Sequence, residues 1–145
     1  MKNTIASIAF LGFLILMGCS DPVSFANDVP ESRDCESTND LVGQTRPLRV
    51  SSLYGIRGNV TIVSDCEIEI TDFFYNGAGP NVSLYGANNG NFRSGVNMSE
   101  VLNGRSWNGE TLNLFLPEGA SFDDINSFSV WCFEFDVDFS STFFN

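Results

Sequence analysis

The first feature of this 145-residue sequence is what it lacks. It contains no histidine, the commonest general base and the commonest metal ligand among side chains. Histidine-based catalytic triads and histidine-ligated zinc hydrolase sites are therefore excluded. Basic residues are scarce, with seven Lys and Arg against eighteen Asp and Glu and a net charge of −11. Because phosphate backbones are bound through Lys and Arg, we expect no nucleic-acid partner.

A long hydrophobic run is also missing. The only extended apolar stretch runs from Ile5 to Met17, which is shorter than the roughly 20 residues of a bilayer-spanning helix. A charged start followed by a short apolar core is typical of a secretory signal, so residues 1–18 are predicted to be removed. The stretch ends in Leu16-Met17-Gly18-Cys19, which resembles the lipobox of bacterial lipoproteins. This resemblance implies that Cys19 is acylated and becomes the new N-terminus.

Residues 19–40 have the composition of an acidic, flexible tether. They contain prolines and carboxylates and show neither the helical nor the strand period of hydrophobicity. Ser20 follows the cysteine in place of the aspartate that retains many lipoproteins at the inner membrane. The membrane is therefore an expected partner through the lipid anchor, with the mature protein at the outer membrane or the cell surface.

Residues 41–145 have the pattern of one β domain. Gly58–Val63 and Glu67–Phe73 alternate polar and apolar residues around a turn at residues 64–66, which predicts a hairpin. Gly, Asn and Pro at residues 76–81 predict another turn, followed by a strand at Val82–Tyr85. No long segment has the helical period, and fourteen Phe supply a core. The predicted fold is all-β, an antiparallel β-sandwich or barrel-like domain of short strands.

The remaining elements are predicted from composition and parity. Residues 88–109, which include Trp107, are rich in Asn and Gly and indicate a long loop with one helical turn at residues 99–102. Residues 128–139 indicate one long strand. Its core face is predicted to carry Trp131, Phe133, Phe135, Val137 and Phe139. Its opposite, acidic face is predicted to carry Phe128, Val130, Cys132, Glu134, Asp136 and Asp138.

Three segments resemble the DM-thirteen domain family. They are Asp72-Phe73-Phe74-Tyr75-Asn76-Gly77-Ala78-Gly79-Pro80-Asn81, then Leu116-Pro117-Glu118-Gly119 followed by Asp124-Ile125, and finally Ser129-Val130-Trp131-Cys132-Phe133-Glu134-Phe135-Asp136-Val137-Asp138-Phe139. The resemblance implies an extracellular or surface β domain with an electron-transfer role that rests on the cysteine of the Val-Trp-Cys element, here Cys132. The chain departs from the family at Asn81, where Asp is usual, and at Ser140, where Gly is usual.

The cysteines that follow Cys19 allow three single pairings, and an exported chain is free to form disulfides. Cys35 and Cys66 are extra relative to the DM-thirteen pattern, which favours a Cys35–Cys66 bridge with Cys132 as a free thiol. The alternative is a Cys66–Cys132 bridge that leaves Cys35 free in the tether.

Two functions follow for Cys132. In the first it is a redox thiol that acts on a redox partner. In the second it is part of the core of a non-catalytic adhesion or surface-ligand module, since free cysteines often behave as small buried hydrophobes. No Lys or Arg follows Arg105, so any cation that activates the thiol must come from elsewhere in the fold. The sequence identifies no cofactor, and the acids of residues 134–138 are expected to form a wet strand face and to bind no metal.

Overall fold

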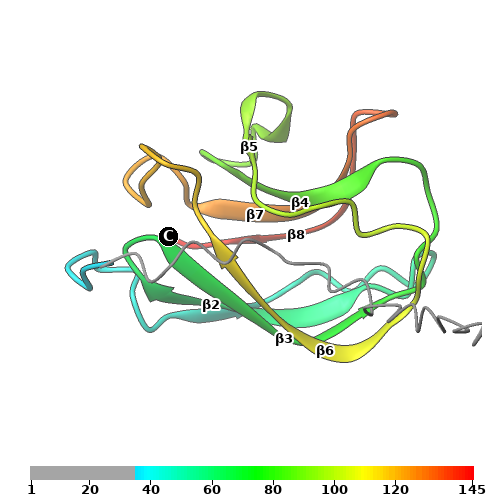
Figure 1. The fold of residues 1–145 in the computed structure, drawn as a ribbon, viewed down its shortest axis with the longest axis horizontal. Coiled ribbons are helices and arrows are strands. Elements are labelled where there is room, and N and C mark those ends of the chain that lie inside the picture. The colour runs from blue at the N-terminus through cyan, green and yellow to red at the C-terminus, as the bar shows by residue number, and fades with distance from the viewer. Residues whose placement is uncertain (1–34) are drawn as a thin grey trace, which may run out of the picture. The chain divides into compact units, whose positions relative to one another are not determined.

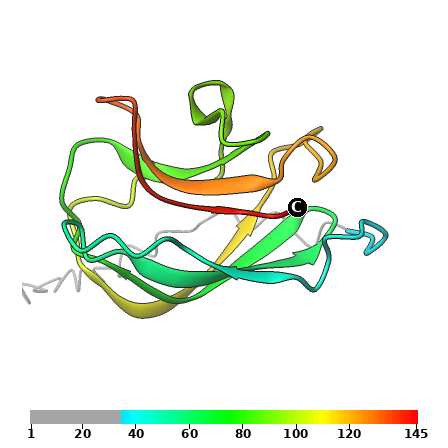
Figure 2. The same cartoon turned by 180° about the vertical axis from the view of Figure 1, so that it is seen from behind.

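The computed structural model describes residues 35–145. The predicted signal, Cys19 and the first part of the tether lie outside these residues. The described chain forms two antiparallel four-stranded sheets that stack as a sandwich, as Figure 1 and the reverse view in Figure 2 show. This confirms the predicted all-β fold. No helix in residues 35–145 has the length and apolar character needed to cross a membrane.

The first sheet has the strand order β1-β2-β3-β6, and the second has the order β5-β4-β7-β8. The strands of the first sheet are β1 (Thr45–Pro47), β2 (Arg57–Ser64), β3 (Glu67–Tyr75) and β6 (Trp107–Phe115). Those of the second are β4 (Val82–Ala87), β5 (Val96–Asn97), β7 (Ser127–Cys132) and β8 (Val137–Phe143). A 3-10 turn, η1 (Phe92–Ser94), precedes β5.

The predicted hairpin is confirmed as β2 and β3. Val60 faces Ile70 across the pair, Ile62 faces Ile68, and all four side chains are buried. Alternation along each strand places these residues on the face that meets the second sheet, while the intervening polar residues face outward. The turn at residues 65–66 joins the two strands.

The predicted long strand at residues 128–139 is wrong. It is a hairpin in which β7 ends at Cys132, residues 133–136 turn, and β8 begins at Val137. The predicted core face is confirmed only for Phe139, which is buried in the main core, while Phe133 is 60% exposed and Phe135 is 65% exposed. The core side chains of β7 belong to the opposite parity, and they are Phe128, Val130 and Cys132.

The cause of this error is that both faces of β7 are covered. Trp131 points away from the main core but is only 8% exposed, since it packs in a second cluster with Phe92 and Ala87. Burial on both sides of a strand removes the alternation that would reveal its inner face. The alternation of Phe and acids after Cys132 belongs to the turn, where Asp136 adopts a φ of 56°.

Two smaller predictions are also corrected. Residues 99–102 form no helical turn but run beside β4, where the Leu102 amide donates to the Val82 carbonyl. Trp107 does not lie in a loop. It begins β6, and its ring meets the edge of Phe73 at a centroid distance of 5.6 Å.

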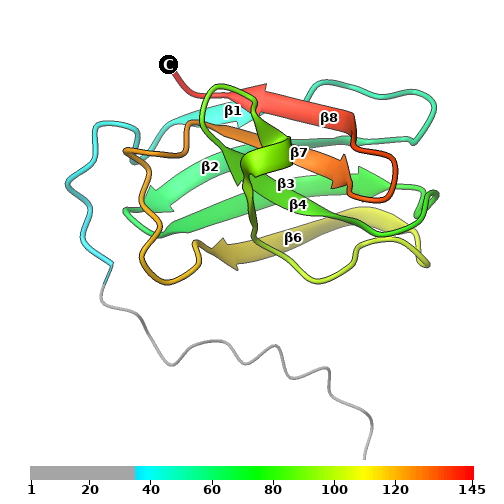
Figure 3. The ribbon, with the colours of Figure 1, turned by 90° about the horizontal axis from the view of Figure 1, so that it is seen from above.

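The sandwich has two distinct ends, which Figures 1 and 3 show from two directions. The thiol end comprises Cys132 and the loops of residues 49–56, 76–81, 103–106 and 133–136, and it lies at the right of Figure 1. The disulfide end comprises residues 35–44, the β2–β3 turn and residues 117–126.

Candidate functional site

The candidate site is the Cys132 thiol at the last position of β7. Cys132 pairs with Val82 of β4 on one side and with Val137 of β8 on the other. Its side chain is completely buried and belongs to the main hydrophobic core. The Sγ atom donates to the carbonyl oxygen of Pro80 at 3.1 Å. The thiol is therefore held inside the protein and closed off by the segment that contains Pro80.

That covering segment is the loop of residues 76–81, which is locked by its own contacts. The hydroxyl of Tyr75 donates to the Ala78 carbonyl, and the Asn76 side chain accepts from the Ala78 amide at 3.0 Å. The Phe133 amide then donates to the Asn81 carbonyl at 3.0 Å, which ties the loop to the residue after the thiol. Residues 76–81 thus form a cap over Cys132.

Two glycines allow the cap to pack this closely. Gly77 has a φ of +78°, and a Cβ there would overlap the backbone carbonyl of Arg105. Gly79 has a φ of +109°, and a Cβ there would lie 3.0 Å from the Phe139 ring. A side chain at either position would carry the strain of a left-handed backbone and also displace a neighbour. The glycines of the sequence motif therefore set the fit of the cap.

Sequence reasoning missed Tyr75 and Pro80 as neighbours of Cys132. Both lie in the Asp72–Asn81 motif, but that motif gave no sign that it contacts a strand about fifty positions later. Tyr75 is buried, and this burial, together with the nearby Cys132 and Tyr54 groups, raises the pKa of Tyr75 to about 12. The phenol stays neutral at physiological pH and acts as a hydrogen-bond donor to the cap.

The thiol has no cationic partner within the described chain, because the arginines of the thiol end make other contacts. Arg49 pairs with Asp138, Arg93 with Asp136, and Arg105 with Glu110. Arg57 stacks on the Phe74 ring at 3.4 Å. Reactive cysteines normally lie in electropositive, accessible surroundings. Cys132 has neither feature in this conformation.

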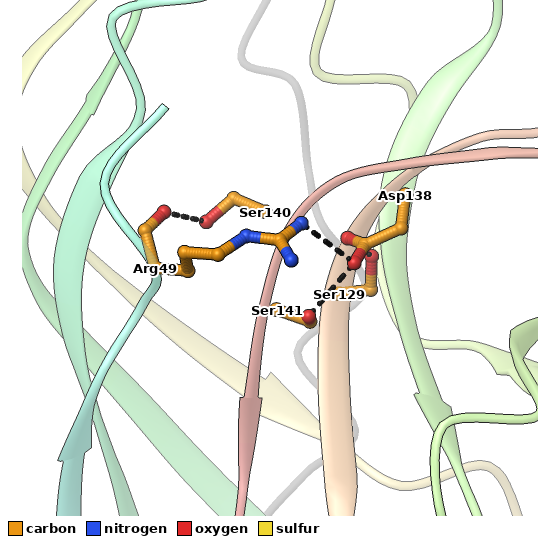
Figure 4. Close-up of polar contacts among 5 residues, drawn as sticks. All are labelled: Arg49, Ser129, Asp138, Ser140 and Ser141. Atoms are coloured by element: carbon orange, nitrogen blue, oxygen red, sulfur yellow. Dashed lines mark hydrogen bonds and ion pairs between the residues drawn. The ribbon is translucent and has the colours of Figure 1, made fainter. Parts of the chain in front are cut away.

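The acids of residues 134–138, expected on one strand face, are separated by the hairpin. Asp138 lies at the base of β8, where its carboxylate accepts from Ser129 at 2.7 Å and from Ser141 at 2.8 Å, as Figure 4 shows. Arg49 reaches the same carboxylate at 3.0 Å, and the Ser140 hydroxyl donates to the Arg49 carbonyl. This network fastens the loop of residues 49–56 to the β7–β8 hairpin.

The other described cysteines are joined at the opposite end. Cys35 and Cys66 form a disulfide with a Cα–Cα distance of 5.7 Å, and this is the pairing that the sequence analysis favoured. Cys66 precedes β3, while the Cys132 cap begins after β3. A nine-residue strand spans about 30 Å, so Cys66 and Cys132 lie much too far apart for a bridge.

The described end of the tether is bound to the domain. The Asp65 carboxylate accepts from the backbone amides of Thr38 and Asn39 and from the Thr38 hydroxyl. These hydrogen bonds, that of the Thr38 side chain first, hold the pKa of Asp65 below its ordinary value. Asn39 also donates to Asp123 at 3.1 Å. Residues 35–39 therefore follow the surface of the disulfide end.

Comparison with known proteins identifies a family for this chain. The family model described as Electron transfer DM13 matches residues 50–144. Two Drosophila melanogaster proteins, Protein Skeletor isoforms B/C and isoforms D/E, are each 32% identical over an alignment of 104 residues, and the alignment covers 65% of this chain. These matches span only 13% and 7% of the two relatives. No solved structure matches. Since the family model covers more than half of the chain, including the cap and Cys132, the protein belongs to the Electron transfer DM13 family.

Proposed function

We propose that this protein is a lipid-anchored extracytoplasmic module that transfers electrons through Cys132. The observation that carries the redox role is the state of this thiol. It is the one cysteine of residues 35–145 outside the disulfide, and it lies beneath a cap built from the family's own Asp72–Asn81 segment. The anchor is supported by the Leu16-Met17-Gly18-Cys19 element after a short apolar run.

The burial of Cys132 restricts the chemistry. Thiol–disulfide exchange requires access of the attacking sulfur to the disulfide, so the cap of residues 76–81 must open before a partner can react. In the open state the Cys132 sulfur forms an S–S bond with one sulfur of a partner disulfide while the partner's own S–S bond breaks. The proton lost by Cys132 passes to the departing partner sulfur. The Cys132 thiol is thereby oxidised and one partner sulfur is reduced, so that electrons and protons balance.

The redox role is tested by reactivity in the folded state. The purified full-length protein is incubated with a small aromatic disulfide, and the mixed disulfide is measured by mass, with Cys132→Ser as the matched control. We expect a slow mixed disulfide at Cys132 in the native protein. Modification only after denaturation would refute the redox role.

The second candidate is a binding module in which Cys132 is a core residue. It is favoured by the complete burial of the thiol and its hydrogen bond to Pro80. In this case Cys132→Ser retains the binding activity of the protein, because serine can donate to the same carbonyl.

The anchor is tested separately. Cys19→Ala removes the only position that the lipobox resemblance assigns for acylation, so we expect the variant to leave the membrane fraction or to accumulate unprocessed. A variant that stays with membranes and keeps the wild-type mature terminus would contradict the anchor.

A further inference from the structure

The thiol end presents an unusual apolar surface. Eight large hydrophobic side chains of residues 35–145 are exposed, and six of them lie in or beside the loops of this end. These six are Val50, Leu53, Val101, Phe133, Phe135 and Val137, with exposures between 44% and 74%. Exposed apolar residues that gather at one end of a domain mark an interaction site more often than scattered ones do.

The two phenylalanines are presented on a fixed support. The base of their hairpin is held on one side by the Asp138 network with Arg49, and on the other by the ion pair of Arg93 with Asp136 (Figure 4 draws the Asp138 network). A hairpin held in this way loses little conformational freedom when it binds a partner. Aromatic side chains on rigid supports are typical of binding hot spots.

Charge is distributed unevenly between the two ends. Seven acids lie in or directly beside the segments of the disulfide end: Glu36, Asp40, Asp65, Glu67, Glu118, Asp123 and Asp124. At the thiol end, Asp136, Asp138 and Glu110 are neutralised by arginines. Glu100 and Glu134 are different, because within the described chain neither carboxylate has a hydrogen bond or ion pair, and Glu134 stands between the exposed Phe133 and Phe135 in the sequence.

The charge of Glu134 indicates which kind of partner fits this apolar surface. A bilayer that took up the two rings would also have to take up the carboxylate, which is costly in an apolar medium. A second copy docked through the same surface would bring two Glu134 carboxylates together, and their like charges repel. A protein partner with a basic side chain between apolar contacts would complement both the rings and the carboxylate.

We propose that the β7–β8 tip, with Phe133, Glu134 and Phe135, together with the loop of residues 49–56, docks a protein partner of that chemistry. The proposal rests on the proposed redox function and names its partner: a protein that presents an apolar surface with a basic residue. The Phe133 amide is bonded to the cap at Asn81. A partner seated on Phe133 therefore contacts the segment that must move to expose Cys132.

The test places a photo-crosslinking benzoyl-phenylalanine at position 135 of the full-length protein, expressed in its own host. The matched control carries the same group at Val63, which is 42% exposed on β2 next to the disulfide end. We expect a discrete crosslinked protein from position 135, none from position 63, and loss of the product in a background of Glu134→Arg. The captured protein is identified by mass, purified and bound to the full-length chain. Phe135→Ala then weakens binding by about tenfold or more.

Several results would overturn the docking surface: crosslinks to lipid alone, crosslinks to a second copy alone, equal capture from position 63, or capture that Glu134→Arg leaves unchanged. The denaturation midpoint of each variant is measured to show that it folds. Repeating the capture with Cys132→Ser distinguishes docking from redox function. Capture that is retained supports the docking surface even if the thiol proves inert, and capture that is lost in this folded variant contradicts it.

Discussion

The placement of the β7–β8 hairpin can be tested by comparing two phenylalanines whose expected roles are reversed between sequence and structure. Phe128 is completely buried, and its ring makes edge contacts with Phe122 at 6.1 Å and Phe144 at 5.7 Å. Phe133 is 60% exposed at the start of the turn. We predict that Phe128→Ala destabilises the protein far more than Phe133→Ala, although sequence parity assigned Phe133 to the core and Phe128 to the opposite face.

The magnitudes follow from burial. Truncating a buried phenylalanine costs about 3–5 kcal/mol, because apolar contacts are lost and a cavity is left. Full burial of such a side chain contributes about 1.5–3 kcal/mol. Phe133 is 60% exposed, so its truncation costs at most about 1.2 kcal/mol. The difference between the two variants is therefore expected to be at least about 2 kcal/mol.

Urea denaturation followed by intrinsic fluorescence measures this difference. With a urea slope of about 1–3 kcal/mol/M for small proteins, the midpoints of the two variants should differ by roughly 0.7 M or more. Equal midpoints, or a lower midpoint for Phe133→Ala, would refute the hairpin and restore the single long strand. The slopes must agree between variants for the midpoints to report stability alone.

Three further predictions follow from the cap and the disulfide end. Gly77→Ala is expected to lower the melting temperature more than Gly104→Ala does. Both glycines have a positive φ, but only a Cβ at Gly77 would overlap backbone atoms, those of Arg105. Equal melting temperatures would contradict the close packing of the cap. Replacing Cys35 and Cys66 by serine removes a disulfide that joins residues with a sequence separation of 31. The free energy of unfolding should then fall by up to about 3.7 kcal/mol. An unchanged free energy of unfolding would show that the bridge does not constrain the unfolded chain. The lowered pKa of Asp65 means that its ionised form favours attachment of residues 38 and 39 to the domain. The stabilisation from this attachment is complete above the ordinary pKa of an aspartate, and it is lost as the pH falls through the lowered pKa of Asp65. Amide chemical shifts of Thr38 and Asn39 should titrate in that acid range in the wild type and not in Asp65→Asn.

The sequence predicted the structure correctly where the pattern involves residues that are close together in the chain. The β2–β3 hairpin follows from alternation over adjacent strands and a short turn, since each inward side chain is specified by its own neighbours in sequence. The turn at residues 76–81 follows from the conformational preferences of Gly, Asn and Pro. Composition also determined the absence of histidine chemistry, because no fold can supply a residue type that the chain lacks.

Tertiary structure alone decided the site. Cys132 is covered by Pro80, which lies 52 positions earlier, and no local pattern encodes a contact of that separation. The inner face of β7 was hidden from the sequence as well, because the segment around Phe92 leaves Trp131 on the outer face only 8% exposed. The exposed rings of Phe133 and Phe135 arise from the same cause: hydrophobic residues predict burial on average, but a turn between two strands forces its side chains outward. Only the path of the chain in space therefore distinguishes a buried core residue from an exposed one here.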